Sequence, residues 1–244
     1  MESVTTFQSA PTAIPMAGLP VMSVVTHELR SPVKVTSSLL NVLSRGYVGE
    51  LNDRQADLVD RARMRIQALE KLIDDLLDLA AGKAEGPAEV EHSPIPLSEV
   101  LHEVCVRYEP VAREKGLWVK YSGLNDGLTV SGDRDELDRI FNNLVGNAVK
   151  YTERGGVEVR AERVDGWIRV TVTDTGIGIP DDALPQLFQE FFRASNAKAT
   201  GESGTGLGLA IVKDLVERYG GRVEVESEEG VGTSFCILMP AASE

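Results

Sequence analysis

A histidine near the start of the chain has the surroundings of a phosphoryl acceptor. His27 lies in the run SVVTHELRSP, residues 23–32, and helical spacing puts it on the same polar face as Ser31. An unperturbed imidazole is mostly neutral at cytoplasmic pH, and its free ring nitrogen is a nucleophile. Glu28 can accept a hydrogen bond from the other ring nitrogen and fix the tautomer, while Pro32 should loosen the helix nearby. The alternative is an incidental surface histidine on a coiled coil.

A second group of polar residues has the spacing of a metal and phosphate site. Asn143, Asn147 and Lys150 recur at intervals of four and three residues, which puts them on one helical face. Amide oxygens can bind Mg²⁺, and the lysine can meet a phosphate as a point charge. Tyr151 follows and can flank a base or a ribose. The alternative is the polar outer face of a surface helix.

A carboxylate at the end of a predicted strand can accept the amine of adenine. Asp174 begins the run DTGIGIP, in which Gly176 and Gly178 allow the backbone to turn sharply. Glycines also let a chain approach a base closely, because they have no Cβ atom. The same run fits an ordinary turn.

Two further segments suggest a lid and a phosphate-binding turn. The run FQEFFR, residues 188–193, precedes a small and polar stretch, residues 194–204, that is typical of a mobile loop closing over a ligand. The run GTGLGL, residues 204–209, then opens a helix, where free N–H groups can bind phosphate. A dinucleotide-binding fold is the alternative, but no βαβ unit surrounds these glycines.

Two long amphipathic helices must position the histidine. Apolar residues recur at helical spacing over residues 21–43, and a second helix, capped by Asn52 or Asp53, should run to about Ala81. The pair carries more apolar surface than it can bury on itself, so we expect a four-helix bundle made by two chains. The second helix has an almost unbroken heptad seam of Val59, Ala62, Ile66, Leu69, Ile73, Leu76 and Ala80.

The remainder of the chain has the pattern of an α/β domain. We predict helices over residues 98–115, 133–151 and 207–219, and strands over residues 117–121, 156–163, 167–173, 222–226 and 233–238. Asp133 and Glu136 have the spacing of a capping box. The expected divisions are a flexible leader or artificial boundary (1–20), a dimerisation and phosphoacceptor hairpin (21–81), a linker (82–96) and a catalytic ATP-binding domain (97–240).

Together these segments resemble the core of two-component sensor histidine kinases. The run around His27 resembles their H-box, and the later runs resemble the N, G1, F and G2 boxes of the Bergerat ATP-binding fold. The resemblance implies a helical hairpin that forms a dimeric four-helix bundle, followed by an α/β-sandwich domain. It also implies ATP and Mg²⁺ as cofactors, phosphorylation of His27, and transfer to an aspartate of a response-regulator receiver domain.

The resemblance implies a role for each residue of the two sites. His27, Glu28 and Ser31 are the implied catalytic residues, with Ser31 supporting weak dephosphorylation of the regulator. Asn147 is the implied Mg²⁺ ligand, with Asn143 beside it. Asp174 is the implied adenine anchor, supported by the Thr233 hydroxyl, and the other implied nucleotide contacts are Lys150, Tyr151, Gly176, Gly178, Arg193, Gly204, Gly206, Leu207 and Gly208. The chain departs from the family pattern at Glu190, where proline is common.

The net charge and the length of the apolar runs limit which partners and which cellular compartment we expect. The net charge of −13 should repel nucleic acid and anionic lipid. No apolar run approaches the ~20 residues that span a bilayer, so we expect a cytoplasmic protein, tethered to the inner membrane only through a sensor region outside this chain. Two other functions stay open: a different Bergerat-fold ATPase, and a non-catalytic dimeric scaffold with a vestigial nucleotide site.

Overall fold

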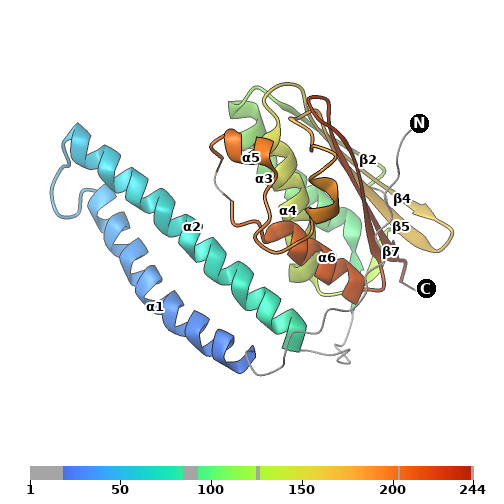
Figure 1. Ribbon diagram of the computed structural model, residues 1–244, viewed down its shortest axis with the longest axis horizontal. Helices are drawn as coiled ribbons and strands as arrows, with labels where there is room; N and C mark the ends of the chain where they lie inside the picture. Colours follow the sequence, from blue (N-terminus) through green and yellow to red (C-terminus); the bar gives the residue numbers. More distant parts are fainter. Residues whose placement is uncertain (1–18, 85–92, 125–126, 203, 243–244) are drawn as a thin grey trace. The chain divides into compact units, whose positions relative to one another are not determined.

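The computed structural model describes residues 19–84, 93–124, 127–202 and 204–242. These residues form two compact units, and Figure 1 gives their elements in chain order. Residues 19–84 belong to a helical unit together with residues 204–207. Residues 93–202 and 208–242 belong to an α/β unit.

The helical unit is a hairpin of two long helices, as predicted. Helix α1 spans Leu19–Ser44 and continues through Pro32, and helix α2 spans Asp53–Ala84. Asn52 is the capping residue of α2. Its Oδ1 accepts from the Gln55 N–H at 3.0 Å, and its own N–H donates to Gln55 Oε1 at 3.0 Å, which is a complete capping box. Within the described ranges, no helix combines the length and apolar character needed to cross a membrane.

Much of the apolar surface of this hairpin is exposed in the single chain. Val33 is buried, but Leu39 and Leu58 expose 59% and 56% of their surface. The exposed apolar side chains of the two helices are Leu29, Val35, Leu39, Val42, Leu58, Met64 and Leu69. Residues 35, 39 and 42 recur at helical spacing, so they form a stripe along one face of α1. Over its described residues, the hairpin therefore has an exposed apolar face.

The α/β unit is built on a five-stranded sheet with the order β2-β4-β5-β7-β6. Strand β2 pairs with β4 in parallel, and the other neighbours are antiparallel. Buried and exposed side chains alternate along the central strands, which agrees with the period of two in the sequence. The strands are β2 (Trp118–Ser122), β4 (Gly156–Val164), β5 (Trp167–Asp174), β6 (Arg222–Glu228) and β7 (Gly232–Pro240).

Three helices cover one face of this sheet (Figure 1). They are α3 (Leu97–Glu114), α4 (Arg134–Tyr151) and α6 (Gly208–Arg218). Their buried side chains meet those of the sheet in one core, which includes Leu101, Phe141, Leu144, Ile168 and Ile237. The resulting two-layer arrangement leaves the opposite face of the sheet to alternating charged and polar side chains such as Arg160, Arg169 and Glu224.

The start of α4 has a capping box in which one set of hydrogen bonds comes from neighbouring residues and the other comes from a residue distant in the sequence. The Asp133 carboxylate accepts from the N–H groups of Asp135 and Glu136, as predicted. The Glu136 carboxylate instead meets Arg218, at 2.7 Å, and the Tyr219 hydroxyl. The Asp133 N–H donates to that same hydroxyl at 3.1 Å. The hydroxyl of Tyr219, the residue that follows α6, thus supplies the second half of the box.

The structure corrects the expected end of the linker. Residues Ser93–Pro96 form strand β1, which pairs antiparallel with β3 (Thr129–Gly132). Sequence analysis missed this pair because β1 is four residues long and contains two prolines, and proline in a run counts against a strand. Helix α2 also extends to Ala84, and residues 85–92 lie outside the described residues.

Candidate functional site

The candidate nucleotide site starts with three polar side chains that lie in one row across the sheet. Asp174 at the end of β5 is in register with Thr233 on β7, which is in register with Ser227 on β6. Side chains in register point to the same face, here the face that the helices cover. Asp174 and Thr233 are buried, and Ser227 is half-buried. Burial of this row means that each polar atom must find a partner.

The Asp174 carboxylate is held by backbone groups in a desolvated position. Its Oδ1 accepts from the Gly176 N–H at 2.8 Å. Burial raises the pKa of this carboxyl to about 6, against the opposing effect of hydrogen bonds from the backbones of Gly176 and Thr233. A desolvated carboxylate is stabilised by any further hydrogen-bond donor that reaches it. The amine of adenine is a donor of that kind.

The support that Thr233 gives to Asp174 differs from the expectation. Its backbone N–H supports the carboxylate, whereas its hydroxyl lies 2.9 Å from Ser227 Oγ. Ser227 was not among the predicted site residues. A serine in an alternating strand gives no chemical signal in the sequence, and its role depends on a partner on the next strand.

Close packing explains the two glycines after Asp174. A Cβ atom on Gly176 would lie 2.5 Å from the Tyr151 carbonyl oxygen and 2.8 Å from Asp174 Oδ1. Gly178 has φ of +64°, and a Cβ there would lie 2.0 Å from the Glu228 carbonyl oxygen. No side chain fits at either position without moving backbone. The glycines therefore allow the turn to pack between α4 and β6.

Hydrogen bonds fix the same turn on both sides. The Ile177 N–H donates to the Tyr151 carbonyl at the end of α4, at 3.1 Å. The Ile179 N–H donates to Ser227 Oγ at 2.8 Å. The run DTGIGIP is thus a turn, as one reading of the sequence had it, but a turn that holds a buried carboxylate in place.

The segment expected to be a mobile lid has structure of its own. Residues Ser195–Ala199 form the short helix α5. The Arg193 guanidinium donates to the carbonyls of Ala197, at 3.1 Å, and Glu202, at 2.6 Å. The Asn196 amide donates to the Gly178 carbonyl at 2.9 Å. Arg193, predicted to contact nucleotide, therefore organises the lid segment, and Asn196 ties that segment to the glycine turn.

Helix α4 brings the predicted metal and phosphate residues to one face. Asn143, Asn147 and Lys150 are all half-buried. The Asn143 amide donates to a backbone carbonyl one turn earlier at 2.9 Å, which leaves its Oδ1 directed at Gly208. A Cβ on Gly208 would lie 2.5 Å from that oxygen. Lys150 Nζ lies 4.8 Å from the centre of the Tyr151 ring, within range of a cation–π contact.

A lysine that sequence analysis missed lies at the end of α4. Lys115 Nζ donates to the carbonyls of Val149, at 3.3 Å, and Lys150, at 3.1 Å. It also lies 3.6 Å from a carboxylate oxygen of Glu202. A cation at a helix C-terminus satisfies carbonyls that have no helical partner. Lys115 thus connects the C-terminal end of α4 to the end of the lid segment.

The remaining predicted residues belong to the helical unit. His27 and Glu28 lie in α1, but their side chains are outside the described part of the structure, and Ser31 is exposed on the same helix. Gly204, Gly206 and Leu207 precede α6 in the sequence and group with the helical unit. The phosphate contacts expected of residues 204–207 stay a prediction.

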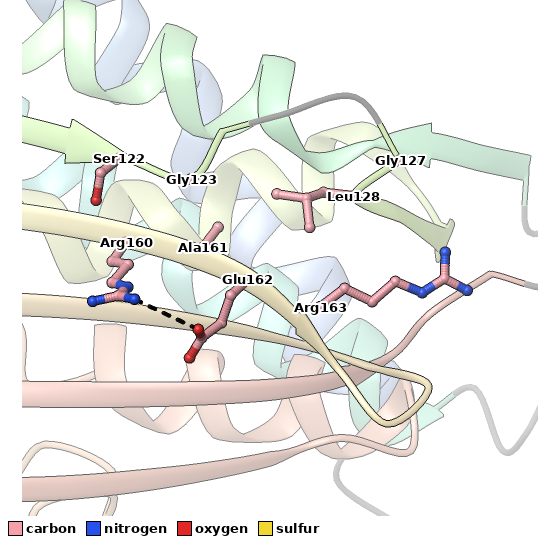
Figure 2. A pocket seen from close by; sticks show the side chains of 8 residues that line it. All are labelled: Ser122, Gly123, Gly127, Leu128, Arg160, Ala161, Glu162 and Arg163. Carbon is pink, nitrogen blue, oxygen red and sulfur yellow. Dashed lines mark ion pairs between the residues drawn. The ribbon is translucent and has the colours of Figure 1, made fainter.

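A separate hollow lies beside the second half of β4 (Figure 2). Its volume is about 510 Å³, and Asp174 pairs with Val157 at the other end of that strand. Among its lining residues, Arg160 lies 3.7 Å from Glu162, which also pairs with Arg169 at 3.0 Å. None of the predicted site residues is among its lining side chains, which are Ser122, Gly123, Gly127, Leu128, Arg160, Ala161, Glu162 and Arg163. We therefore assign no nucleotide contact to it.

Comparisons with known proteins agree with this geometry. Residues 132–243 match the family described as histidine kinase-, DNA gyrase B-, and HSP90-like ATPase. Residues 21–85 match the His Kinase A phospho-acceptor domain. The range of each match contains the corresponding site, Asp174 in the first and His27 in the second.

Curated relatives span both matched regions. An uncharacterized sensor-like histidine kinase of Rhizobium meliloti (strain 1021) is 35% identical over 90% of this chain and 42% of its own length. The signal transduction histidine-protein kinase BaeS of Escherichia coli (strain K12) is 32% identical over 90% of this chain and 46% of its own length. The chain thus spans less than half the length of these curated relatives.

Solved structures extend the similarity to the fold. Full-length ShkA in complex with AMPPNP has a TM-score of 0.76 and 31% identity, over 92% of this chain and 46% of that one. The mycobacterial sensor histidine kinase MprB has a TM-score of 0.51 and 31% identity, over 63% of this chain and 99% of that one. Because both domains match in order and the similarity extends to sequence and fold, the chain belongs to the sensor histidine kinases of two-component systems.

Proposed function

We propose that this chain binds ATP with Mg²⁺, phosphorylates its own His27, and passes the phosphoryl group to an aspartate of a receiver domain. The observation that carries the proposal is the buried Asp174 carboxylate, held by two backbone N–H groups beside a turn that excludes side chains. It occurs in the same chain as a phosphoacceptor domain. An ATPase site and an acceptor histidine in one chain are the two parts that autophosphorylation requires.

The base side of the site fits adenine. Asp174 offers an acceptor to the amine, and a Cβ on Gly176 would lie 2.8 Å from its Oδ1, so the glycine keeps a side chain away from that oxygen. A buried charged acceptor with a matching donor is a strong contact. Burial of this carboxylate is costly, so a further hydrogen bond from the adenine amine would offset part of that cost.

The phosphate side would be served by one face of α4. Asn147 and Asn143 would hold Mg²⁺ through their amide oxygens, since this hard ion prefers oxygen ligands and keeps several waters. Lys150 would meet the phosphates. Bound Mg-ATP supplies the transferable phosphoryl group and the metal charge that offsets the charge of the phosphates. In a chain with a net charge of −13, such local cations are needed for an anionic ligand.

The acceptor chemistry would belong to α1. A neutral ring nitrogen of His27 attacks the γ-phosphorus while the bond to the ADP oxygen breaks, and the other ring nitrogen then gives up its proton. Glu28 would hold that second nitrogen and select the tautomer. The receiver carboxylate next attacks the same phosphorus and the P–N bond breaks. Ser31 is exposed one turn beyond His27, where its hydroxyl would orient a water for weak dephosphorylation of the regulator.

The acting form would be a homodimer located in the cytoplasm. The exposed stripe on α1 and the exposed apolar residues of α2 support pairing of two hairpins, because burial of apolar surface drives association. A requirement for ATP favours the cytoplasm.

Following the γ-phosphate of ATP to its product distinguishes the proposed function from its alternatives. With γ-labelled ATP and Mg²⁺, the proposed kinase gives label on the protein that survives alkali and is lost in acid, and His27→Ala abolishes it. Another Bergerat-fold ATPase releases the label as inorganic phosphate with no labelled protein. A scaffold with a vestigial site does neither. Either of the last two results would overturn the proposal.

A further inference from the structure

A serine that the proposed chemistry does not use holds together three parts of the nucleotide site. Ser227 Oγ accepts from the Ile179 N–H at 2.8 Å and lies 2.9 Å from the Gly232 carbonyl oxygen. It also lies 2.9 Å from Thr233 Oγ1. One hydroxyl therefore joins the glycine turn, the first residue of β7, and the side chain next to Asp174.

Counting protons fixes the direction of each of these bonds. The Ile179 N–H can only donate, so Ser227 accepts there, and the Gly232 carbonyl can only accept, so Ser227 donates there. A serine hydroxyl has one proton. Ser227 must therefore accept from Thr233, and the Thr233 hydroxyl must donate to Ser227.

Thr233 consequently presents an acceptor, and no donor, to the rest of the site. Asp174 lies beside it in the same cross-strand row, and its carboxylate is also an acceptor. Both residues are buried. This wall of the site matches a donor such as a purine 6-amine, directly or through a bridging water. It opposes a 6-oxo group, because two acceptors repel each other and neither is satisfied.

We propose that Ser227 is a positioning residue that sets base selectivity. By holding the Thr233 proton away from the base, it keeps the site selective for 6-amino purine nucleotides over 6-oxo purine nucleotides. The inference rests on the proposed function, because it deepens the identity of the nucleotide. A purely structural role for Ser227 is the competing explanation, since its loss would also leave the Ile179 N–H without this acceptor.

Affinity for two nucleotides separates the two explanations. A looser turn weakens all nucleotides alike, whereas a free Thr233 proton changes the preference between bases. The full chain should be titrated calorimetrically with Mg-ATP and with the magnesium complex of inosine triphosphate, whose base has an oxo group in place of the amine. The variants are Ser227→Ala, Ser227→Thr and, as a matched control, Ser234→Ala. Ser234 pairs with Thr173 at 3.0 Å on the opposite face of the sheet.

The wild type should prefer ATP, and Ser227→Ala should reduce that preference about three- to tenfold, the change expected for one hydrogen bond. Ser227→Thr retains a hydroxyl and should restore the wild-type ratio, and Ser234→Ala should leave it unchanged. Thr233→Val removes the oriented hydroxyl itself, so it should lower the same ratio. In that background Ser227→Ala should have no further effect on the ratio.

Three results contradict the inference. An unchanged ratio in Ser227→Ala would reduce Ser227 to a structural residue. Wild-type protein that binds both nucleotides equally would show that no such selectivity exists. Wild-type protein that binds neither nucleotide would overturn the proposed function itself, which the first two results leave intact.

Discussion

Replacement of Asp174 by asparagine should abolish ATP binding and at the same time stabilise the α/β unit without nucleotide. The carboxyl has an ordinary pKa of 3.8, and burial raises it to about 6 in the folded protein. This difference corresponds to about 3 kcal/mol at pH above 7. Asparagine is never charged, so it avoids that cost. Its amide accepts through one oxygen only, so we expect a net gain of about 1–2 kcal/mol.

The pH dependence gives this prediction a second test. A carboxyl whose pKa is raised on folding binds its proton more tightly in the folded state. Its contribution to stability is therefore greatest at low pH and is lost as pH rises from about 4 through about 6. The advantage of Asp174→Asn should be full at pH 7.5 and much smaller at pH 4.5.

Urea unfolding followed by tryptophan fluorescence measures the gain in stability of the α/β unit, which contains Asp174. The chain has two tryptophans, Trp118 on β2 and Trp167 on β5, and both belong to the α/β unit. Calorimetry with Mg-ATP should show a loss of affinity of at least about 2–3 kcal/mol, because a charged acceptor is lost. A variant that is less stable than wild type at pH 7.5, or equally stabilised at both pH values, would refute the reasoning.

Three further changes test the other parts of the account. Asn147→Asp puts a carboxylate near the triphosphate and should reduce autophosphorylation at least tenfold without lowering the unfolding midpoint; retained Mg²⁺-dependent activity would mean that another group holds the metal. Glutamate at both Ile66 and Leu69 should dissociate the dimer in analytical ultracentrifugation, and a wild-type monomer at micromolar concentration would contradict the dimer. Ser31→Ala should remove dephosphorylation of the regulator while His27 is still phosphorylated, whereas Ser31→Thr should increase it, because a β-branched hydroxyl is better held. Unchanged dephosphorylation in Ser31→Ala would remove the hydroxyl from that reaction.

Helices and strands in which apolar residues recur at regular spacing were predictable from the sequence. Strand β5 alternates strictly between buried and less buried residues, and α4 carries its apolar residues on one face. In both elements the local pattern and the tertiary burial agree. For the same reason Asp174 could be recognised, because it ends a clear strand and precedes two closely spaced glycines.

Residues whose roles depend on distant partners were not predictable. Ser227 acts through Thr233 on the next strand, and Lys115 acts through carbonyls at the end of α4. Neither residue type is unusual at its position in the sequence. The pairing of β1 with β3 was missed for a different reason, since two prolines obscure a four-residue strand whose partner lies beyond α3.

The central claim is that the phosphoryl group of ATP is transferred to His27 by the site that contains Asp174. Its most direct test is to incubate the wild type, His27→Gln and Asp174→Asn with Mg-ATP, keep the digests alkaline, and map the phosphorylated peptide by mass spectrometry. The account predicts one phosphoryl group on His27 in the wild type and none in either variant, although His27→Gln binds ATP as tightly as the wild type. Phosphorylation at another residue, or in His27→Gln, would contradict it.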